Sequence, residues 1–192
     1  MTELLQGPDE TLAKPGPIEL PTQGAVILRQ AQLEDAQRLF ELLKANKGRL
    51  RKAHMHVPRS LEEVERRIVS HNSKGYLDFG IWAGNELIGE IGLGRDEPDS
   101  ENAEIFYWLD RDHIGMGYAA DAAGSLAEYA LGPLGINILT AKVDANNAHS
   151  ESSKRTLRRA GFQPLTHESA RVHVFTRRAD LARHQPPHSL NS

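Results

Sequence analysis

A turn with two glycines lies where the sequence changes from a strand pattern to a helix pattern, and its spacing suits the binding of a phosphate. Residues 103–109 are largely apolar and predict a strand, and residues 117–131 have helical spacing up to a Gly132-Pro133 stop. Gly115 and Gly117 lie between these elements. The first N–H groups of a helix have no intrahelical acceptor and carry the positive end of its dipole, and glycines let that backbone approach a ligand closely. The pattern therefore indicates an anion site, although two glycines before a helix also occur in simple tight turns.

The same glycines, together with Ala120, also resemble a dinucleotide-binding fingerprint. That motif belongs to a short strand–helix–strand unit at the start of a domain, and an acidic residue follows about 20 positions later at a strand end. Here hairpin strands precede the glycine turn, and the nearest suitable acid, Asp144, lies further along. We therefore set the dinucleotide interpretation aside.

The remaining elements come in a mixed order and predict an α+β (α/β) fold. Strands are expected at residues 25–28, 76–82, 87–93, 136–143, 162–165 and 171–176, and helices at 33–43, 60–71 and 150–160. The helix at 60–71 opens on the capping-box pattern Ser60-Leu61-Glu62-Glu63. Because hairpin strands precede a strand–helix–strand–helix run, the sheet is expected to be mixed rather than wholly parallel.

Length and composition limit the possible functions. The 192 residues suffice for one domain, expected at 24–181, between a flexible Pro- and Gly-rich leader at 1–23 and a flexible tail at 182–192. The absence of cysteine excludes disulfides, zinc–thiolate sites and a cysteine nucleophile. A formal charge of −3 argues against broad nucleic-acid binding. Neither a secretory signal nor an apolar run of membrane-spanning length is visible, so a soluble, cytoplasmic protein without a metal site is expected.

Three groups of residues together resemble the GNAT superfamily of N-acetyltransferases. They are the strand Glu104-Ile105-x-Tyr107-Trp108-Leu109, the turn Ile114-Gly115-Met116-Gly117-Tyr118-Ala119, and the segment from Asn147 to Ser153 with Leu157 and Gly161-Phe162. Within that superfamily the chain is most similar to the RimJ/RimL branch, which acetylates N-terminal amino groups of ribosomal proteins, and residues 46–50 and 81–89 share the pattern of that branch. The resemblance covers residues 25–178. It implies the GNAT fold, a mixed, mostly antiparallel central sheet flanked by helices, with strands splayed at the cofactor site.

The resemblance implies that acetyl-coenzyme A (acetyl-CoA) is the acetyl donor. No metal is expected, because the histidines do not repeat at a zinc-ligand spacing. The family's pyrophosphate motif falls on Ile114, Gly115, Met116, Gly117, Tyr118 and Ala119, with Ile114 in place of the family's Gln or Arg. Backbone N–H groups supply most of the grip, so binding is expected despite that change. Leu109 and Asn147 complete the expected cofactor contacts, and counting back from the Gly-Phe pair would instead put Ser150 at the family's asparagine position. A side chain blocking the turn at Gly117 would argue against this site.

The resemblance also points to two catalytic side chains. Glu104 stands where the family pattern carries an acid and is the first candidate for the base or the amine-binding group; its alternative is a strand-end carboxylate in solvent or paired with Arg111. Ser153, eight positions before the Gly-Phe pair, is a candidate donor to the leaving sulfur, and its alternative is a helix N-cap. Other acetyltransferases of the superfamily place a tyrosine four residues before that pair, where this chain has Leu157. Glu168 and a water chain are the alternative proton acceptors.

Two basic or mixed segments complete the expected site. The last helix carries a basic face that either meets the 3′-phosphate of the cofactor or faces solvent, made of Lys154, Arg155, Arg158 and Arg159. The acceptor pocket is expected at a loop over residues 46–59 and at the hairpin around His167. Alternating basic and apolar residues in that loop suit an acidic or peptide-like partner.

The predicted function is N-acetyl transfer to the N-terminal α-amino group of a protein or peptide, by direct attack of the amine on the thioester. Fixed dipoles would meet the charge on the developing oxyanion, and the attacking amine must be neutral. Three alternatives stay open: a small-amine acetyltransferase, a non-catalytic acyl-CoA-binding module, and an enzyme that acetylates aminoacyl-tRNA, against which the acidic balance counts. A homodimer is compatible with the sequence, and no membrane partner is expected.

Overall fold

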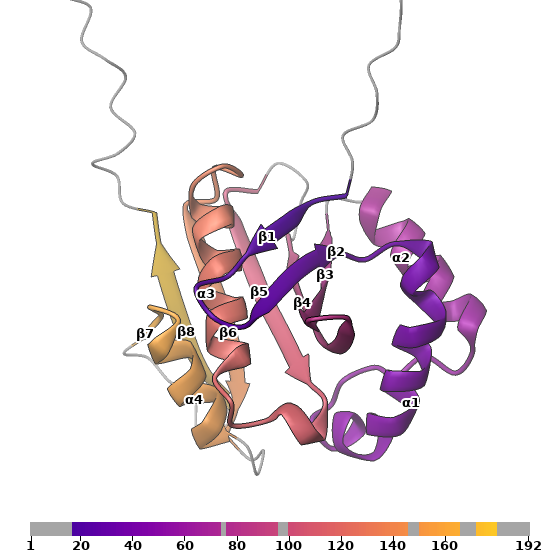
Figure 1. The fold of residues 1–192 in the computed structure, drawn as a ribbon. Coiled ribbons are helices and arrows are strands. Elements are labelled where there is room, and N and C mark those ends of the chain that lie inside the picture. The colour runs from indigo at the N-terminus through magenta and orange to yellow at the C-terminus, as the bar shows by residue number, and fades with distance from the viewer. Residues whose placement is uncertain (1–16, 74–75, 96–99, 146–149, 166–171, 180–192) are drawn as a thin grey trace, which may run out of the picture.

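An eight-stranded mixed sheet forms the centre of the part of the chain that the structure describes (Figure 1). The structure, a computed structural model, describes residues 17–73, 76–95, 100–145, 150–165 and 172–179. In sheet order the strands are β1 (Glu19–Pro21), β2 (Val26–Gln30), β3 (Leu77–Ala83), β4 (Glu86–Gly94), β5 (Asn102–Leu109), β6 (Ile138–Asp144), β8 (Val172–Arg178) and β7 (Gln163–Pro164). The helices are α1 (Ala36–Lys52), α2 (Leu61–Ser73), α3 (Tyr118–Leu131) and α4 (Ser150–Arg159), with 3-10 turns at Leu33–Asp35 and Arg111–His113.

The strands β5 and β6 part within the sheet. They pair in parallel only where residues 102–104 face residues 138–140. β5 then continues to Leu109 and β6 to Asp144 without further pairing between them. The other neighbouring strands in the described segments pair antiparallel. The expected mixed, mostly antiparallel sheet with splayed strands is therefore confirmed, and the backbone of β5 beyond Glu104 has no strand partner on the β6 side.

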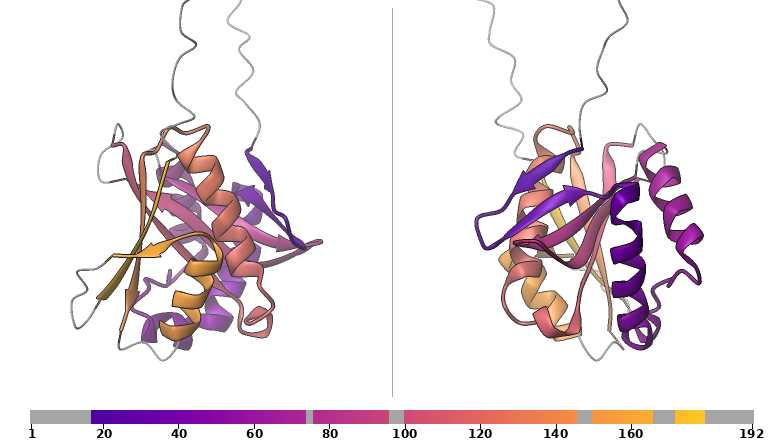
Figure 2. Two further views of the ribbon diagram at one scale, coloured as in Figure 1. Left: turned by 90° about the vertical axis from the view of Figure 1, so that its left-hand side faces the viewer. Right: turned by 45° about the vertical axis from the view of Figure 1, so that its right-hand side comes forward.

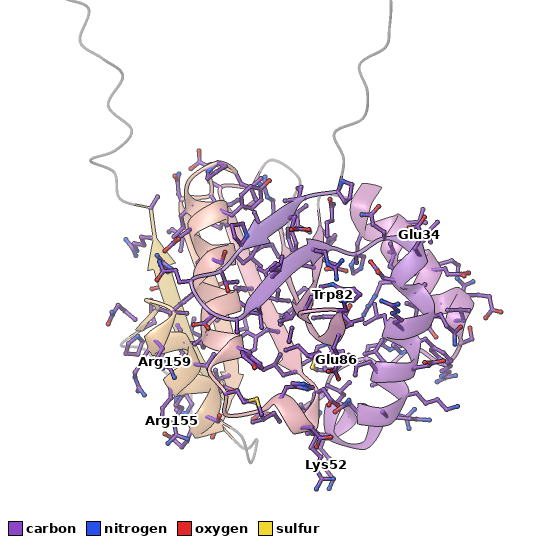
Figure 3. The ribbon with its side chains drawn as sticks, in the orientation of Figure 1. Glu34, Lys52, Trp82, Glu86, Arg155 and Arg159 are labelled. Atoms are coloured by element: carbon purple, nitrogen blue, oxygen red, sulfur yellow. The ribbon has the colours of Figure 1, made fainter. Side chains whose placement is uncertain are left out.

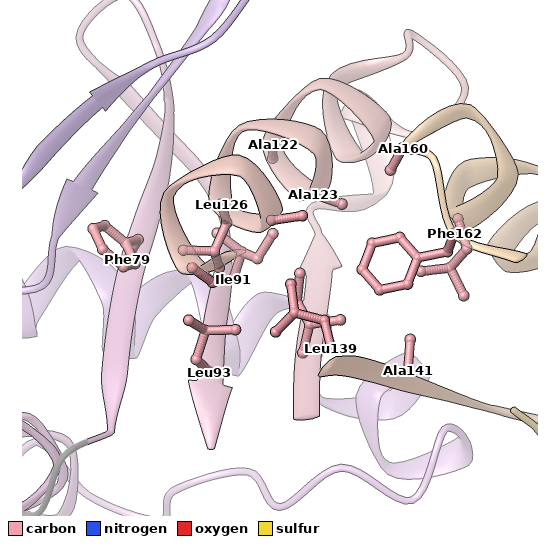
Figure 4. Close-up of a cluster of buried hydrophobic side chains, with 14 of the residues drawn as sticks. Phe79, Ile91, Leu93, Ala122, Ala123, Leu126, Leu139, Ala141, Ala160 and Phe162 are labelled. Atoms are coloured by element: carbon pink, nitrogen blue, oxygen red, sulfur yellow. The ribbon is translucent and has the colours of Figure 1, made fainter. Parts of the chain in front are cut away.

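The helices cover both faces of the sheet (Figure 2). α3 and α4 pack on one face, against β5 and β6, whereas α1 and α2 pack on the other, against β4 and β3. Ala122 and Ala123 are fully buried, and their small side chains bring α3 close to the sheet (Figure 4). Alternation along β5 places Ile105 and Leu109 in the core under α3, whereas Trp108 lies in the second core under α1 and α2. The strand that reaches the gap is thus held from both sides.

The N-terminal strand begins inside the segment that was expected to be a flexible leader. Glu19–Pro21 form β1 and pair antiparallel with β2, and Leu20 packs partly against the core under α3. The prediction of a leader over residues 1–23 is therefore wrong for residues 19–21, because a short edge strand with a single core-facing side chain leaves little hydrophobic pattern. The other strands and helices, apart from α1, lie within two residues of their predicted bounds.

α1 is longer than the sequence pattern suggested. The helix was expected to end at residue 43 and to be followed by a loop over residues 46–59, but it continues to Lys52. Asn46 and Leu50 continue the buried face of Leu39 and Leu43, and this is the physical reason for the difference. The buried Asn46 amide has hydrogen-bond partners: its Nδ2 donates to the Leu42 carbonyl at 3.0 Å and to the Asp110 carboxylate, just after β5, at 2.6 Å. None of the described helices is both long and apolar enough to cross a bilayer.

Candidate active site

A cavity of about 400 Å³ lies where β5 and β6 part. Its walls are Arg49, Leu50, Ala53 and Met55 from α1 and the segment after it, Tyr107, Trp108 and Leu109 from β5, Ile114, Gly115, Gly117, Ala119 and Ala120 from the glycine turn and α3, and Ser152, Ser153, Arg155, Thr156 and Arg159 from α4. Because helices from both faces of the sheet contribute, the cavity passes through the gap between the strands. A depression of similar volume between α3 and the turn after β1 shares Ala120 and Arg159 with this cavity but includes neither the glycine turn nor the parted strands.

The glycine turn is open toward this cavity. Gly115 and Gly117 have φ angles of +88° and +90°, which L side chains rarely adopt, and Gly117 is the N-cap of α3. A Cβ atom added at Gly115 would meet nothing within 4 Å, and one at Gly117 would come no closer than 3.6 Å to Arg159 Nη2. Within the described segments, no hydrogen bond uses the N–H groups of Gly117, Tyr118 or Ala119. An unblocked helix start with free N–H donors fits a phosphate group.

The wall formed by α4 carries hydroxyl groups beside a partly buried tyrosine. Tyr107 extends from β5 and donates from its Oη to the Ser153 carbonyl at 3.3 Å. Burial raises the pKa of Tyr107 to about 12, so its phenol stays protonated at any physiological pH. Arg155 and Arg159 lie on the same helix (Figure 3). This side of the cavity therefore offers hydrogen-bond donors and positive charge.

The opposite wall is the last turn of α1, and Arg49 is its charged residue. The Nη2 atom of Arg49 donates to Asn46 Oδ1 at 3.0 Å and to the carbonyl oxygen of Leu109. Asn46 in turn donates to Asp110 Oδ1 at 2.6 Å. Burial lowers the pKa of Arg49 from its usual value, and the nearby Asp110 carboxylate acts in the opposite direction. The guanidinium is thus fixed at the end of β5, beside the gap.

The structure brings six of the predicted site residues together around this cavity: Leu109, Ile114, Gly115, Gly117, Ala119 and Ser153. Two other members of the predicted turn motif do not line it. Met116 is exposed, and Tyr118 packs partly against the core under α3. The predicted residues Asn147 and Glu168 lie outside the described residues, whereas Ser150 is the first residue of α4.

Glu104, predicted as the base, does not line the cavity. Its carboxylate pairs with Lys142 Nζ on the neighbouring β6 at 2.5 Å, and the two side chains are 42% and 58% exposed. The partner is therefore Lys142 and not Arg111. Glu104 is the last residue of β5 that pairs with β6, five residues before Leu109, so it lies at the start of the gap and not among the lining residues.

Two residues that line the site were given no role of their own in the sequence analysis, Tyr107 and Arg49. Tyr107 shares the face of β5 with Ile105 and Leu109, and the alternation of that strand was a signal that could have found it. Arg49 lay within the segment 46–59 predicted for the acceptor, but that segment was expected to be a loop, whereas Arg49 is held in place by α1, which continues past residue 43. On the basic face of α4, Arg155 and Arg159 line the cavity, whereas Lys154 pairs with an acid of its own helix.

The ionisable groups that line the cavity are three arginines and one tyrosine. They are Arg49, Arg155, Arg159 and Tyr107, and no carboxylate or imidazole is among the described lining residues. Such a wall attracts an anionic ligand and disfavours a cationic one. The cavity therefore suits a phosphate-bearing donor together with an amine in its neutral form.

A mixed sheet that parts over a cation-lined cavity, next to an open glycine turn at a helix start, defines an acetyltransferase architecture. Residues 25–163 match the family model described as "Acetyltransferase (GNAT) domain", and the chain belongs to this family. The resemblance found in the sequence is thereby confirmed.

Named relatives support the RimJ/RimL branch. The chain is 36% identical over 98 residues to the ribosomal-protein-serine acetyltransferase of Escherichia coli (strain K12). The aligned stretch covers 47% of this chain and 54%, about half, of that protein. It is 30% identical over 144 residues to YdaF of Bacillus subtilis (strain 168), covering 71% of this chain and 77% of YdaF.

Solved structures show the same fold. A RimL ribosomal L7/L12 α-N-protein acetyltransferase in complex with coenzyme A superposes with a TM-score of 0.72 at 21% identity, covering 85% of this chain and 99% of that one. Mycobacterium smegmatis RimJ in complex with CoA-disulfide gives a TM-score of 0.70 at 18% identity, with 85% and 87% covered.

Proposed function

We propose that the protein transfers the acetyl group of acetyl-CoA to the N-terminal α-amino group of a protein or peptide. The observation that carries the proposal is a single cavity that joins an open anion-binding turn to the gap between β5 and β6. Membership of the acetyltransferase family supports the chemistry, and the names of the E. coli and RimL relatives support a ribosomal-protein acceptor. An acceptor of that kind would place the reaction in the cytoplasm.

The proposed mechanism is direct attack of the amine on the thioester. The pyrophosphate of acetyl-CoA binds the N–H groups at Gly117 and Ala119, and the thioester reaches into the gap between the strands. The amine nitrogen forms the new C–N bond, the C–S bond breaks, and the amine loses one proton. Backbone dipoles of β5 without a strand partner face the developing oxyanion. The Ser153 hydroxyl donates a hydrogen bond to the leaving thiolate.

The proton of the amine goes to water in this proposal. Glu104 is paired with Lys142 away from the cavity, and the described lining offers no carboxylate or imidazole. The cationic walls lower the affinity for an ammonium ion, so the neutral amine is the form that binds. Glu168, outside the described residues, is the second candidate for the proton acceptor.

The pH dependence tests this assignment. If no side chain of the enzyme acts as the base, kcat/KM follows the neutral fraction of the acceptor, whose α-amino pKa is about 7.7–8.0. We expect kcat/KM to rise with pH, by about four- to sixfold from pH 7 to pH 8, and then to reach a plateau, because Tyr107 ionises only near 12. An inflection that stays fixed when the acceptor amine is exchanged for one of higher pKa would show that an enzyme group takes the proton.

The function itself is tested by mass spectrometry of acceptors incubated with labelled acetyl-CoA. N-terminal peptides of ribosomal proteins are expected to gain one acetyl group at the α-amine, with release of one thiol, and peptides with a blocked N-terminus are expected to gain none. Turnover of free amino acids or polyamines, with peptides left unmodified, would indicate a small-amine enzyme. Calorimetric binding of acetyl-CoA without turnover of any amine would indicate a binding module.

Ser153 is expected to act on the leaving group, and its neighbour provides a matched control. Ser153→Ala should lower kcat about tenfold, about 1.4 kcal/mol in the activation free energy, with KM for acetyl-CoA unchanged. Ser152 lines the same cavity from the adjacent position, and Ser152→Ala should leave kcat within about twofold. Steady-state kinetics decide the matter: equal losses in the two variants would assign Ser153 a packing role only.

A further inference from the structure

Arg49 has hydrogen-bonding capacity that its protein contacts do not use. The structure records partners for its Nη2 atom only, the Asn46 side chain and the Leu109 carbonyl. Its Nε atom is buried without a hydrogen-bond partner among the described residues. An arginine carries five N–H donors, and a buried donor without an acceptor costs about 1–3 kcal/mol. The Nη1 atom also has no recorded partner among the described residues, and unlike Nε it is not fully enclosed, so it is the donor that a ligand in the cavity can reach.

The position of Arg49 identifies the side of the cavity that it serves. It lies on α1, on the opposite face of the sheet from the glycine turn and from Arg155 and Arg159 of α4. The phosphates of the donor already have those groups on the α3 and α4 side. Arg49 is also tied to the carbonyl of Leu109, the last residue of β5, where the strands have parted. Arg49 therefore lines the cavity from the face of the sheet that the donor's phosphates leave free for an acceptor.

The surroundings favour a neutral oxygen as the missing partner. The acceptors that Arg49 already contacts are an amide oxygen and a backbone carbonyl. The Asp110 carboxylate, held by Asn46, lies near enough to offset part of the positive charge. An uncharged carbonyl completes the hydrogen bonds of the guanidinium without adding a second counter-charge. In an N-terminal peptide, the first carbonyl carbon is two bonds from the amine nitrogen that must enter the gap, so one residue can present both groups.

We infer that Arg49 selects α-amino acceptors by donating a hydrogen bond to the carbonyl oxygen of the acceptor's first residue. This inference rests on the proposed function and names the specificity-determining residue of the same site. A lysine side chain or a polyamine has no carbonyl beside its amine, so it leaves the Arg49 donors unpaired. The hydrogen bond also fixes the amine relative to the thioester, which contributes to orientation before attack.

The test compares two acceptors within each enzyme. One is an N-terminal peptide, and the other is the same peptide with its first carbonyl reduced to CH₂, with rates expressed per concentration of neutral amine. The wild type should favour the normal peptide in kcat/KM by about tenfold or more, the range of a hydrogen bond from a charged donor. Arg49→Met should reduce that preference to within about twofold, and Arg49→Lys should restore only part of it because its donors are not forked.

A matched control is Arg155→Met, which removes a second arginine of the same cavity from the α4 wall. Its acceptor preference should equal that of the wild type, and only KM for acetyl-CoA should rise. The preference is the ratio of two kcat/KM values measured with the same variant, so a partial loss of folded enzyme lowers both values equally and leaves the ratio unchanged. An Arg49→Met enzyme that loses rate equally with both acceptors, or that loses only acetyl-CoA affinity, would overturn the assignment. Absence of turnover with every peptide in the wild type would instead refute the proposed function.

Discussion

Replacing Gly117 with aspartate is expected to raise KM for acetyl-CoA about 100-fold, equivalent to about 2.7 kcal/mol of binding free energy. Gly117 is the N-cap of α3 with a φ of +90°, so any side chain there strains the backbone. The added carboxylate would also lie at the free N–H groups where we place the pyrophosphate, and would repel it. Titration calorimetry with CoA measures the loss directly, and steady-state kinetics give the matching change in KM.

Two further variants separate charge from strain. Gly117→Asn has nearly the same shape as the aspartate variant without its charge, and it should lose clearly less affinity. Gly84 occupies the β3–β4 turn with a φ of +57°, has open space around its Cβ position and does not line the cavity. Gly84→Asp should therefore leave CoA affinity unchanged. Equal losses for the asparagine and aspartate variants of Gly117 would mean that no anion binds at the turn.

The glycine turn could be predicted because its signal is local, whereas the splayed strands were expected only from the resemblance to the GNAT superfamily. Gly115 and Gly117 follow a strand pattern directly and begin a helix pattern, and each pattern is readable within about fifteen residues. The order of elements also gave the mixed sheet. These features position the cavity, so the location of the site followed from the sequence.

The side chains that furnish the cavity were harder to predict because they meet across long sequence separations. Glu104 and Tyr107 lie on the same strand, but their roles depend on which side chain contacts the helix α4 and which contacts the neighbouring strand β6. The partner of Glu104 is Lys142, and that of Tyr107 is Ser153, contacts of 38 and 46 residues in separation. The position of Arg49 depends on the continuation of α1 from residue 43 to Lys52, and the many polar residues of that stretch hide its helical pattern. Pattern reasoning places strands, whereas register and packing decide which side chain enters the site.

A buried polar network under α1 and α2 supports the cavity from behind. Glu90 on β4 is 3% exposed and accepts hydrogen bonds from Arg67 Nη2 and from Trp108 Nε1, the latter at 3.0 Å. Trp108 is itself a wall of the cavity. The carboxylate thus joins α2, β4 and the strand that ends at the gap.

Removing that carboxylate is expected to cause a large loss of stability. Glu90→Ala should lower the free energy of unfolding by about 2–4 kcal/mol, because it leaves the partly buried Arg67 cation, 22% exposed, without its partner and the buried Trp108 Nε1 without an acceptor. Urea denaturation followed by fluorescence measures the change. Glu151→Ala is the control, since its exposed carboxylate pairs with Lys154 on the surface and should contribute less than about 1 kcal/mol. A loss of that small size for Glu90→Ala would contradict a structural role for the network.

A double variant and the pH dependence separate the charge of Glu90 from its packing. Glu90→Leu combined with Arg67→Met leaves no buried charge and should recover at least half of the loss, although Trp108 Nε1 still lacks its acceptor. Burial raises the pKa of Glu90 above its unfolded value, despite the opposing effect of Arg67. A group of this kind contributes stability that is fully present below the unfolded pKa and is lost as the pH rises through the folded pKa. The wild type should therefore lose stability relative to Glu90→Gln as the pH rises from about 4 toward neutrality, and the reverse sign would show that attraction to Arg67 exceeds the cost of burial.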